Sequence, residues 1–262
     1  MQHFLTFKEI SNEQLAPDLI GGKAGSLALL YQHGFSIPKG FVITTEFFGS
    51  FSKENKSMEF SDQDIKTINQ YIDECSPHGL VAVRSSAAVE DSNNQSYAGQ
   101  FDSFLNVEKD NVPDAVKKCW HSMHNIRAQQ YARGKNTNLK MAVIVQKMIV
   151  PEVSGVAFST HPVNGDKDSM VIEAVLGSNE LLVQGAVTPD LYIVGKNFTI
   201  LDKKIVPQAE NHQQKLSDDQ TVEVARLVAD MKDFFNVEID VEWAIENGKL
   251  FILQSRPITT VQ

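Results

Sequence analysis

The clearest candidates for chemistry lie near the C-terminus, where polar and apolar residues alternate over Val237–Ile245. A period of two places Asp240 and Glu242 on the same face of a predicted strand. Gln254 and Arg256 follow on the next predicted strand. Carboxylate and amide oxygens suit Mg²⁺, and an arginine suits a phosphate. These four side chains therefore predict a site for a metal-bound phosphate compound, provided that the two strands bring them onto one patch.

The register of this hairpin decides whether the four side chains meet. A two-residue turn at Asn247-Gly248 sets Glu242 opposite Leu253 and mixes a polar face with an apolar one. A three-residue loop, Asn247–Lys249, keeps each face consistent, and we therefore expect it. The pairs that this loop predicts are Ile245 with Phe251, Trp243 with Leu253, Glu242 with Gln254, and Asp240 with Arg256. The alternative is an edge hairpin whose polar residues form only an exposed, salt-bridged face.

Lys23 lies in a glycine-rich segment, Gly21–Gly25, directly before the apolar run Ser26–Tyr31, which predicts a helix that ends at Gly34. Glycines let backbone N–H groups approach a phosphate, and the N-terminus of a helix favours negative charge. The segment is not a Walker A loop, because GxxxxGK[ST] is absent. Two interpretations stay open at this point, a phosphate-binding loop and ordinary turn and cap chemistry.

Two arginines are further candidates for phosphate contacts. Arg84 directly follows the short apolar run Leu80–Val83, which predicts a buried strand. Because an unpaired buried cation is costly, Arg84 must either pair with Glu90 or Asp91 or reach a ligand. Arg127 lies on the inner half of a predicted helix and is the weaker candidate, because most arginines on helices are solvated.

The elements that must position these residues fall into two groups. The first half mixes helices and strands, whereas strands dominate the second half. We therefore expect a mixed lobe over residues 1–139 and a strand-rich lobe over residues 140–262. The predicted helices are 26–31, 46–52, 62–74 and 110–133, with one more after the capping box at Ser217–Gln220. The predicted strands are 41–44, 80–83, 141–150, 154–159, 169–176, 191–194, 237–245 and 251–257, and residues 85–100 are expected to form a loop.

The composition limits what such a protein can bind. Over 262 residues, 24 Lys and Arg stand against 33 Asp and Glu, which gives a formal net charge of −9. This balance argues against a nucleic-acid or anionic-membrane surface, so any anion must be held by a few local cations.

No apolar run reaches about 18 residues, so no transmembrane helix is expected. Cys75 and Cys119 are far apart and show no CxxC spacing, which fits a reducing compartment and predicts a cytoplasmic protein.

Together these segments resemble the N-terminal ATP-binding domain of the pyruvate phosphate dikinase and phosphoenolpyruvate synthase family, which is also used by rifampin phosphotransferases. The matching blocks run in order along nearly the whole chain. They are Gly21–Ala24 with Leu27, Ile37–Thr44, Val83–Ala87 with Glu90-Asp91, Tyr97–Gln100 with Phe104–Val107, Val145–Met148, Ser154–Phe158, Thr188–Asp190, Asp240–Ala244 and Leu253–Thr259. One departure lies at Gly177-Ser178-Asn179-Glu180, where the family usually has Gly-Leu-Gly-Glu.

The resemblance implies an α+β fold of the ATP-grasp type, a single unit over residues 1–262 with two lobes and a nucleotide cleft between them. It also implies that ATP and Mg²⁺ are bound. The residues implied to hold the ATP phosphates are Lys23, Arg84 and Arg127, with a loop over them that includes Ser96, Ala98, Gly99 and Gln100. The residues implied to contact adenine through a backbone edge are Gln146, Lys147 and Met148, and Glu152 is implied to reach the ribose. The residues implied to bind Mg²⁺ are Glu242 and Gln254, with Asp240 assisting, and Arg256 is implied to stabilise charge on the transferring group.

The resemblance further implies an ATP-dependent phosphotransferase module, similar to the ATP half-reaction of the dikinases. Such a module passes a phosphoryl group to a phosphohistidine domain or a partner chain, and no nucleic-acid or membrane partner is expected. No Thr-Ser-His-Ala-type segment is present, and His161, which precedes Pro162, is expected to be structural. Two alternatives stay open, a stand-alone kinase with an unknown small-molecule acceptor and a non-catalytic nucleotide-binding regulator. The full set of charged residues argues against the regulator.

Overall fold

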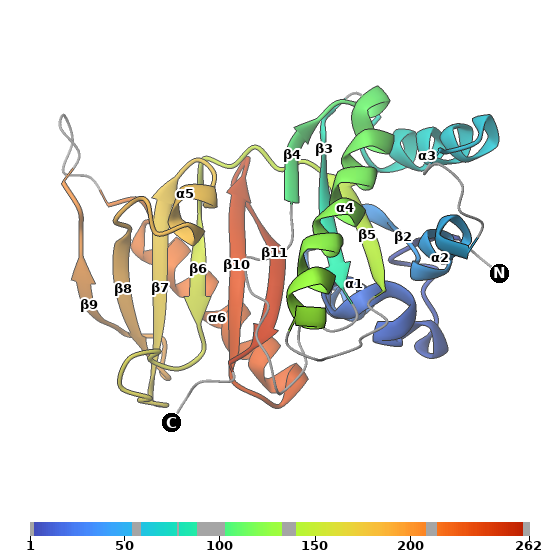
Figure 1. Cartoon of the computed structure of the whole chain (residues 1–262). Coiled ribbons are helices and arrows are strands. Elements are labelled where there is room, and N and C mark those ends of the chain that lie inside the picture. The colour runs from blue at the N-terminus through green and yellow to red at the C-terminus, as the bar shows by residue number, and fades with distance from the viewer. Residues whose placement is uncertain are drawn as a thin grey trace. The chain divides into compact units, whose positions relative to one another are not determined.

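The computed structural model of the chain describes residues 3–53, 59–77, 79–87, 103–132, 140–207 and 214–258, with the backbone alone for 50–53 and 124–132 (Figure 1). The chain forms two compact units, Met1–Met148 and Ile149–Gln262. The boundary expected at residues 139 and 140 is therefore wrong. β5 (Met141–Lys147) pairs with two strands of the first unit, although its β-branched composition matches that of the strands after it.

The first unit is built on a five-stranded sheet in which every pair is antiparallel. Its spatial order is β1 (Phe4–Thr6), β2 (Gly40–Ile43), β5, β3 (Val81–Ala87) and β4 (Ser103–Val107). The helices of the unit are α1 (Pro17–Gln32), α2 (Thr45–Lys53), α3 (Asp62–Cys75) and α4 (Val112–Ala132), with 3₁₀ turns at Asn12–Leu15 and Lys109–Asn111. The four predicted helices are confirmed, and α1 begins well before its predicted start.

Helices cover both faces of this sheet. Val81 and Val83 of β3 belong to the apolar core that the sheet forms with α2, α3 and α4. Because successive side chains of a strand point to opposite faces, Arg84 and Ser86 lie on the other face of β3. That face is the one that α1 packs against. The sheet thereby places Arg84 on the same side as the helix that carries Lys23.

The end of α1 follows from its glycine. Gly34 has a φ of 84°, a left-handed conformation that glycine adopts at no steric cost. Phe35 N donates to Leu30 O at 3.0 Å, and Gly34 N donates to Tyr31 O at 3.1 Å. These two bonds form a Schellman motif and satisfy carbonyls that the helix end leaves without partners. The predicted glycine stop is confirmed.

The second unit is built on a six-stranded sheet that is also antiparallel throughout. Its spatial order is β11 (Lys249–Pro257), β10 (Ile239–Glu246), β6 (Val153–Phe158), β7 (Ser169–Leu176), β8 (Asp190–Gly195) and β9 (Ile200–Lys204). A short helix, α5 (Glu180–Val183), follows β7, and α6 (Asp218–Phe235) packs across one face of the sheet (Figure 1).

The start of α6 confirms the predicted capping box. Gln220 N donates to Ser217 Oγ at 3.2 Å, and Ser217 N donates to Gln220 Oε1 at 2.9 Å. Within the described ranges, no helix combines the length and the hydropathy that crossing a membrane requires. The cytoplasmic location expected from the sequence stays a prediction.

Candidate functional site

The hairpin of β10 and β11 brings together the four polar residues near the C-terminus. Glu242 lies opposite Gln254, and Asp240 lies opposite Arg256, as predicted. The rest of the predicted register is wrong. The turn has two residues, Asn247 and Gly248, whose φ angles of 51° and 70° are typical of a type I′ turn. Consequently the apolar pairs of the hairpin are Trp243 with Ile252 and Ile245 with Leu250, and Phe251 lies opposite Ala244.

A β-bulge reconciles the short turn with the polar pairs. The register shifts between Glu242 and Trp243, and Leu253 is the extra residue that β11 carries there. In an uninterrupted strand Ile252 and Gln254 would share one face. The bulge moves Gln254 to the opposite face, and Arg256 follows it. The predicted register is wrong near the turn because it assumed that the two strands pair without a bulge.

The four side chains form a close charged cluster on one face of the hairpin. Arg256 Nε lies 3.5 Å from Asp240 Oδ1, and Arg256 Nη2 lies 3.8 Å from Glu242 Oε1. Glu242 is 8% exposed and Gln254 is 4% exposed, so the carboxylate and the amide are largely withdrawn from water. Arg256 Nε is buried and makes no hydrogen bond among the described residues. The guanidinium therefore keeps donors that a further anion can use.

Glu238, which the period of two places on the same face, is engaged elsewhere. Its carboxylate accepts a hydrogen bond from Ser159 Oγ at 2.6 Å and pairs with Lys232 of α6 at 2.9 Å. Burial raises the pKa of Glu238, but the hydrogen bonds from Ser159 and Lys232 outweigh it and leave the pKa below its ordinary value. Glu238 is thus an ionised scaffold residue, and Asp240 and Glu242 are the carboxylates of the cluster.

β10 is held in place by its neighbour β6, through Gly155. A Cβ on Gly155 would lie 1.8 Å from Glu173 O of β7 and 2.8 Å from Cζ2 of Trp243. Trp243 is fully buried directly opposite Gly155 and next to Glu242 in the chain. The glycine of the Ser154–Phe158 block therefore provides the space that seats the strand bearing Glu242.

Lys23 lies at a kink inside α1, so the glycine-rich loop expected before the helix is wrong. Gly21, with a φ of 75°, interrupts the helix, and Lys23 belongs to the first turn after the interruption. Ser86 Oγ of β3 donates to Ile20 O at 2.8 Å and accepts from Ala24 N at 3.0 Å. A Cβ on Gly21 would lie 2.1 Å from Ser86 O, so the close approach of strand and helix requires glycine. Ser86 thereby caps the helical segment that carries Lys23, which is 8% exposed.

Arg84 lies in the middle of β3, which corrects the expectation that it ends a strand. β3 continues to Ala87, and Arg84 pairs with Ile144 of β5 and Ser103 of β4. The loop expected over residues 85–100 therefore begins later, after Ala87. Ser96, Ala98, Gly99 and Gln100 lie outside the described residues, as do Glu90 and Asp91. Arg127 belongs to the part of α4 for which only the backbone is described.

The segment Gln146–Met148 is more enclosed than expected. Gln146, 2% exposed, donates from Nε2 to Pro38 O at 2.9 Å. Lys147 N donates to Lys39 O at 2.8 Å, and Met148 N donates to Leu80 O at 3.0 Å. Both of these N–H groups therefore already have backbone acceptors, and the expected adenine contact stays a prediction. A contact from Lys147 or Met148 to a base has to come from carbonyl oxygens or side chains.

Glu152 and His161 each make hydrogen bonds within the second unit. Glu152 is exposed, and its Oε1 accepts from Asn247 N at 2.9 Å, which ties the start of β6 to the β10–β11 turn. His161 Nδ1 lies 3.3 Å from Val163 N, within a loop closed by His161 N donating to Asp166 O. These contacts agree with the structural role expected for His161.

Sequence reasoning gave Asp190 no role, yet it organises a buried polar cluster. Asp190 is fully buried and accepts hydrogen bonds from Lys215 Nζ, from Lys215 N at 2.9 Å, and from Val206 N at 2.9 Å. Tyr192 OH lies 3.3 Å from its Oδ2. Burial raises the pKa of Asp190, but the hydrogen bonds from Lys215 and Val206 outweigh it and lower the pKa overall. The sequence block Thr188-Pro189-Asp190 pointed to this position, but its residues alone did not indicate a buried ion pair.

Comparison with known proteins decides which family has this architecture. The family described as the pyruvate phosphate dikinase AMP/ATP-binding domain matches residues 58–262. The chain belongs to this family. The α+β fold of the ATP-grasp type expected from the sequence is confirmed. The crystal structure of PH1788 from Pyrococcus horikoshii has a similar fold, with a TM-score of 0.53 and 13% identity over 96% of this chain and 95% of that one.

The relatives of this chain include proteins named as two kinds of enzyme. A probable phosphoenolpyruvate synthase of Methanocaldococcus jannaschii is 32% identical over 100% of this chain and 27% of its own length. Another from Archaeoglobus fulgidus is 33% identical over 93% of this chain and 40% of its own length. The rifampicin phosphotransferase of Bacillus cereus is 30% identical over 98% of this chain and 36% of its own length. The chain thus spans less than half the length of each of these relatives.

Proposed function

We propose that the chain is an ATP-dependent phosphotransferase module that binds MgATP and passes a phosphoryl group to a histidine on another domain or chain. Membership of an AMP/ATP-binding domain family supports the choice of nucleotide. The names of the relatives, phosphoenolpyruvate synthase and rifampicin phosphotransferase, support phosphoryl transfer. The observation that carries the proposal is the cluster of Asp240, Glu242, Gln254 and Arg256, which joins oxygen ligands to a guanidinium with an unused donor.

The chemistry of the cluster fits Mg²⁺ in particular. No group of three or more His, Cys, Asp or Glu side chains is placed to hold a metal among the described residues. Mg²⁺ does not need such a cage, because it is commonly bound by one or two carboxylates together with substrate phosphates and waters. We assign Glu242 and Gln254 as the protein ligands, with Asp240 assisting. When bound, Mg²⁺ neutralises charge on the phosphate oxygens.

The remaining residues are assigned by what each can do chemically. Lys23 and Arg84 bind phosphate oxygens, since both project from the neighbouring α1 and β3 of the first unit. Arg256 stabilises the charge that develops on the transferring group, and Lys23, Arg84 and Asp240 complete the catalytic set. No protein nucleophile is required in this module, because phosphoryl transfer depends on positioning and electrostatic stabilisation. Further phosphate contacts are proposed for Arg127, Ser96, Ala98, Gly99 and Gln100, base contacts for Gln146, Lys147 and Met148, and a ribose contact for Glu152.

Product analysis tests the proposed reaction. The full chain is incubated with ATP and Mg²⁺, and the nucleotides are separated by chromatography. Little turnover is expected without a histidine acceptor, and the products formed should be AMP and phosphate, as in dikinase chemistry. Accumulation of ADP would favour direct transfer to a small-molecule acceptor instead. If titration calorimetry detects ATP binding but no product forms even with a histidine-domain acceptor, the non-catalytic nucleotide-binding role is favoured and the proposal is contradicted.

Two substitutions test the assigned residues. Glu242→Ala and Arg256→Ala should abolish the residual turnover while the chain stays folded, as judged by circular dichroism. Arg226→Ala is the matched control, because Arg226 is an exposed arginine of the same unit that lies over the ring of Phe198. Unchanged turnover in both site variants would refute the assignment.

A further inference from the structure

Glu173 of β7 carries a charge for which the described part of the chain provides no partner. Its side chain is half-buried and forms no hydrogen bond or ion pair with any described residue. Burial raises the pKa of its carboxyl, and no donor opposes this shift. Because such a carboxylate has lost part of its hydration, a ligand that supplies hydrogen-bond donors is favoured at this position.

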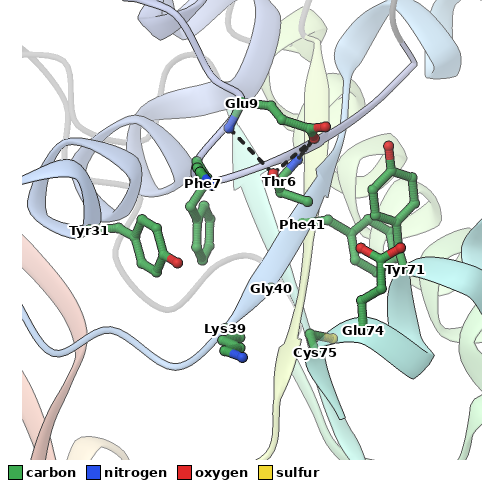
Figure 2. A pocket seen from close by; sticks show the side chains of 11 residues that line it. Thr6, Phe7, Glu9, Tyr31, Lys39, Gly40, Phe41, Tyr71, Glu74 and Cys75 are labelled. Carbon is green, nitrogen blue, oxygen red and sulfur yellow. Dashed lines mark hydrogen bonds between the residues drawn. The ribbon is translucent and has the colours of Figure 1, made fainter. Parts of the chain in front are cut away.

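A carboxylate of the first unit shows the contrast. Glu9 lines a pocket of about 460 Å³ in that unit. Its Oε2 accepts from Thr6 N at 2.9 Å and from Thr6 Oγ1 at 2.8 Å (Figure 2). The protein itself therefore supplies donors to Glu9, whereas the described residues supply none to Glu173.

Glu173 lies on the same face of the six-stranded sheet as the proposed magnesium ligand Glu242. Glu173 is directly opposite Val156 of β6, and Val156 is directly opposite Glu242 of β10 (Figure 1). Directly opposite residues of an antiparallel sheet point to the same face. At about 4.8 Å between neighbouring strands, the backbone positions of Glu173 and Glu242 are roughly 10 Å apart.

This face of the sheet is accessible around Glu173. The opposite face is covered by α6, because Leu216, just before this helix, donates from its N to Tyr192 OH at 3.1 Å, and Tyr192 is fully buried. Val156 and Leu191, the two residues directly opposite Glu173, are only half-buried. An apolar surface therefore flanks the carboxylate and leads along one row of the sheet to Glu242.

The chemistry of this surface suits one part of ATP. A carboxylate repels phosphate, so the triphosphate is not expected at Glu173. The adenine ring presents acceptor nitrogens beside its amino group, and a carboxylate disfavours these acceptors. The ribose joins the triphosphate to the base and presents two neighbouring hydroxyls, each of which can donate to a carboxylate oxygen.

We propose that Glu173 binds the ribose hydroxyls of the nucleotide whose phosphates lie at the cluster of Glu242 and Gln254. This inference rests on the proposed function and adds a residue to it. Glu152, which is already proposed for the ribose, has its Oε1 engaged by Asn247 N at 2.9 Å. Because both oxygens of Glu173 are available, Glu173 supplies the larger share of the ribose contact.

Titration calorimetry of the full chain with two nucleotides tests this inference. The probes are ATP and 2′,3′-dideoxy-ATP, which lacks both hydroxyls, each with saturating Mg²⁺. The wild type should bind ATP roughly tenfold more tightly, as expected for a hydrogen bond to a charged group. Equal affinity for the two probes would overturn this inference alone, whereas no binding of either nucleotide would overturn the proposed function together with it.

Two variants assign the preference for ATP to the carboxylate of Glu173. Glu173→Gln should reduce the ratio of the two affinities to roughly twofold, because a neutral acceptor holds a hydroxyl less strongly, and Glu173→Val should reduce it further. The ratio is the readout, because loss of a negative charge can strengthen the binding of both triphosphates alike. Glu223→Gln removes the same charge from an exposed position on α6 and should keep the wild-type ratio. An unchanged ratio in both Glu173 variants, or a larger loss in Glu152→Gln, would overturn the inference.

Thermal unfolding separates this result from a loss of structure. Glu173 makes no hydrogen bond or ion pair with the described residues that its replacement would break, and valine favours a strand. Both variants should therefore unfold at the wild-type temperature or slightly above it. A lower unfolding temperature in Glu173→Gln would indicate a structural role for the carboxylate and contradict the inference.

Discussion

Replacing Ser86 with alanine should destabilise the first unit, whereas the same change at its neighbour Ser85 should not. Ser86 Oγ joins two buried backbone groups, Ile20 O at 2.8 Å and Ala24 N at 3.0 Å, on either side of the kink in α1. Ser86→Ala leaves both groups without this partner. Leaving a buried polar group unsatisfied costs about 1–3 kcal/mol, and loss of a helix cap costs about 0.5–2 kcal/mol. Because the two costs overlap at Ala24, we expect a loss of about 2 kcal/mol in the free energy of unfolding.

Ser85 provides a matched control one residue away on the same strand. Its side chain is also fully buried, but its Oγ has no hydrogen-bond partner among the described residues. It lies on the face of β3 that contributes Val83 to the apolar core. Removing a hydroxyl that makes no hydrogen bond from such a place relieves a burial cost, so Ser85→Ala should be neutral or slightly stabilising.

Urea denaturation and amide exchange measure this difference. The midpoint for Ser86→Ala should fall at an unchanged m value, with a thermal shift of about 4–8 °C for a unit of this size. The amide of Ala24 should exchange faster in Ser86→Ala than in Ser85→Ala. Equal stability of the two variants, or an unchanged exchange rate at Ala24, would show that Ser86 does not cap the segment that carries Lys23.

Three further predictions concern the scaffold. Gly155→Ala should destabilise the second unit by about 3 kcal/mol or more, because its Cβ would meet a backbone oxygen that cannot move aside. Gly49→Ala is the control, because a Cβ at this position meets nothing within 4 Å, and it should be neutral or stabilising by up to about 1 kcal/mol. Equal changes in stability for the two glycine variants in urea denaturation would contradict the packing argument. The carboxyl of Asp190 has a lowered pKa in the folded state, so its contribution is complete above the ordinary pKa of about 3.9 and is lost as the pH falls through the folded value. Asp190→Asn removes the charged partner of buried Lys215 and should therefore lower the free energy of unfolding by about 3 kcal/mol at pH 7. The stability of this variant should also fall less steeply than that of the wild type as the pH is lowered. An equally steep fall in both proteins would argue against this ion pair. Burial raises the pKa of the Cys75 thiol to about 11, so iodoacetamide should label it slowly at pH 8 unless urea is added, and rapid labelling of the folded chain at Cys75 would contradict its burial.

Long periodic segments were predictable because their pattern and their burial have the same cause. The strand at Ser169–Leu176 agrees with β7 at both ends, and the predicted helix 62–74 agrees with α3 to within one residue. The start of α6 was readable because a capping box places two specific side chains at fixed spacing. Short elements such as β1 and β4 were missed, since three to five residues carry too little periodicity to separate a strand from a loop.

The polar residue pairs of the candidate site were predicted from the sequence, but the β-bulge that produces them was not. Glu242 opposite Gln254 and Asp240 opposite Arg256 followed from keeping polar residues on one face. The bulge at Leu253 did not, because a bulge is set by tertiary packing and leaves no fixed pattern in the strand that carries it. Contacts between distant segments, such as Ser86 with the kink at Gly21, likewise depend on which elements become neighbours. The same limit applies to the sheet assignment of β5.

The Mg²⁺ dependence of ATP affinity tests the central claim most directly. Titration calorimetry of the full chain with ATP, at increasing Mg²⁺, should show an affinity that rises with the metal. Glu242→Gln removes a carboxylate that is 8% exposed and keeps its shape, so most of this rise should disappear while the fold is retained. Glu223→Gln, an exposed change on α6, should keep the wild-type response. An undiminished rise in affinity for Glu242→Gln would contradict the assignment of this cluster as the MgATP site.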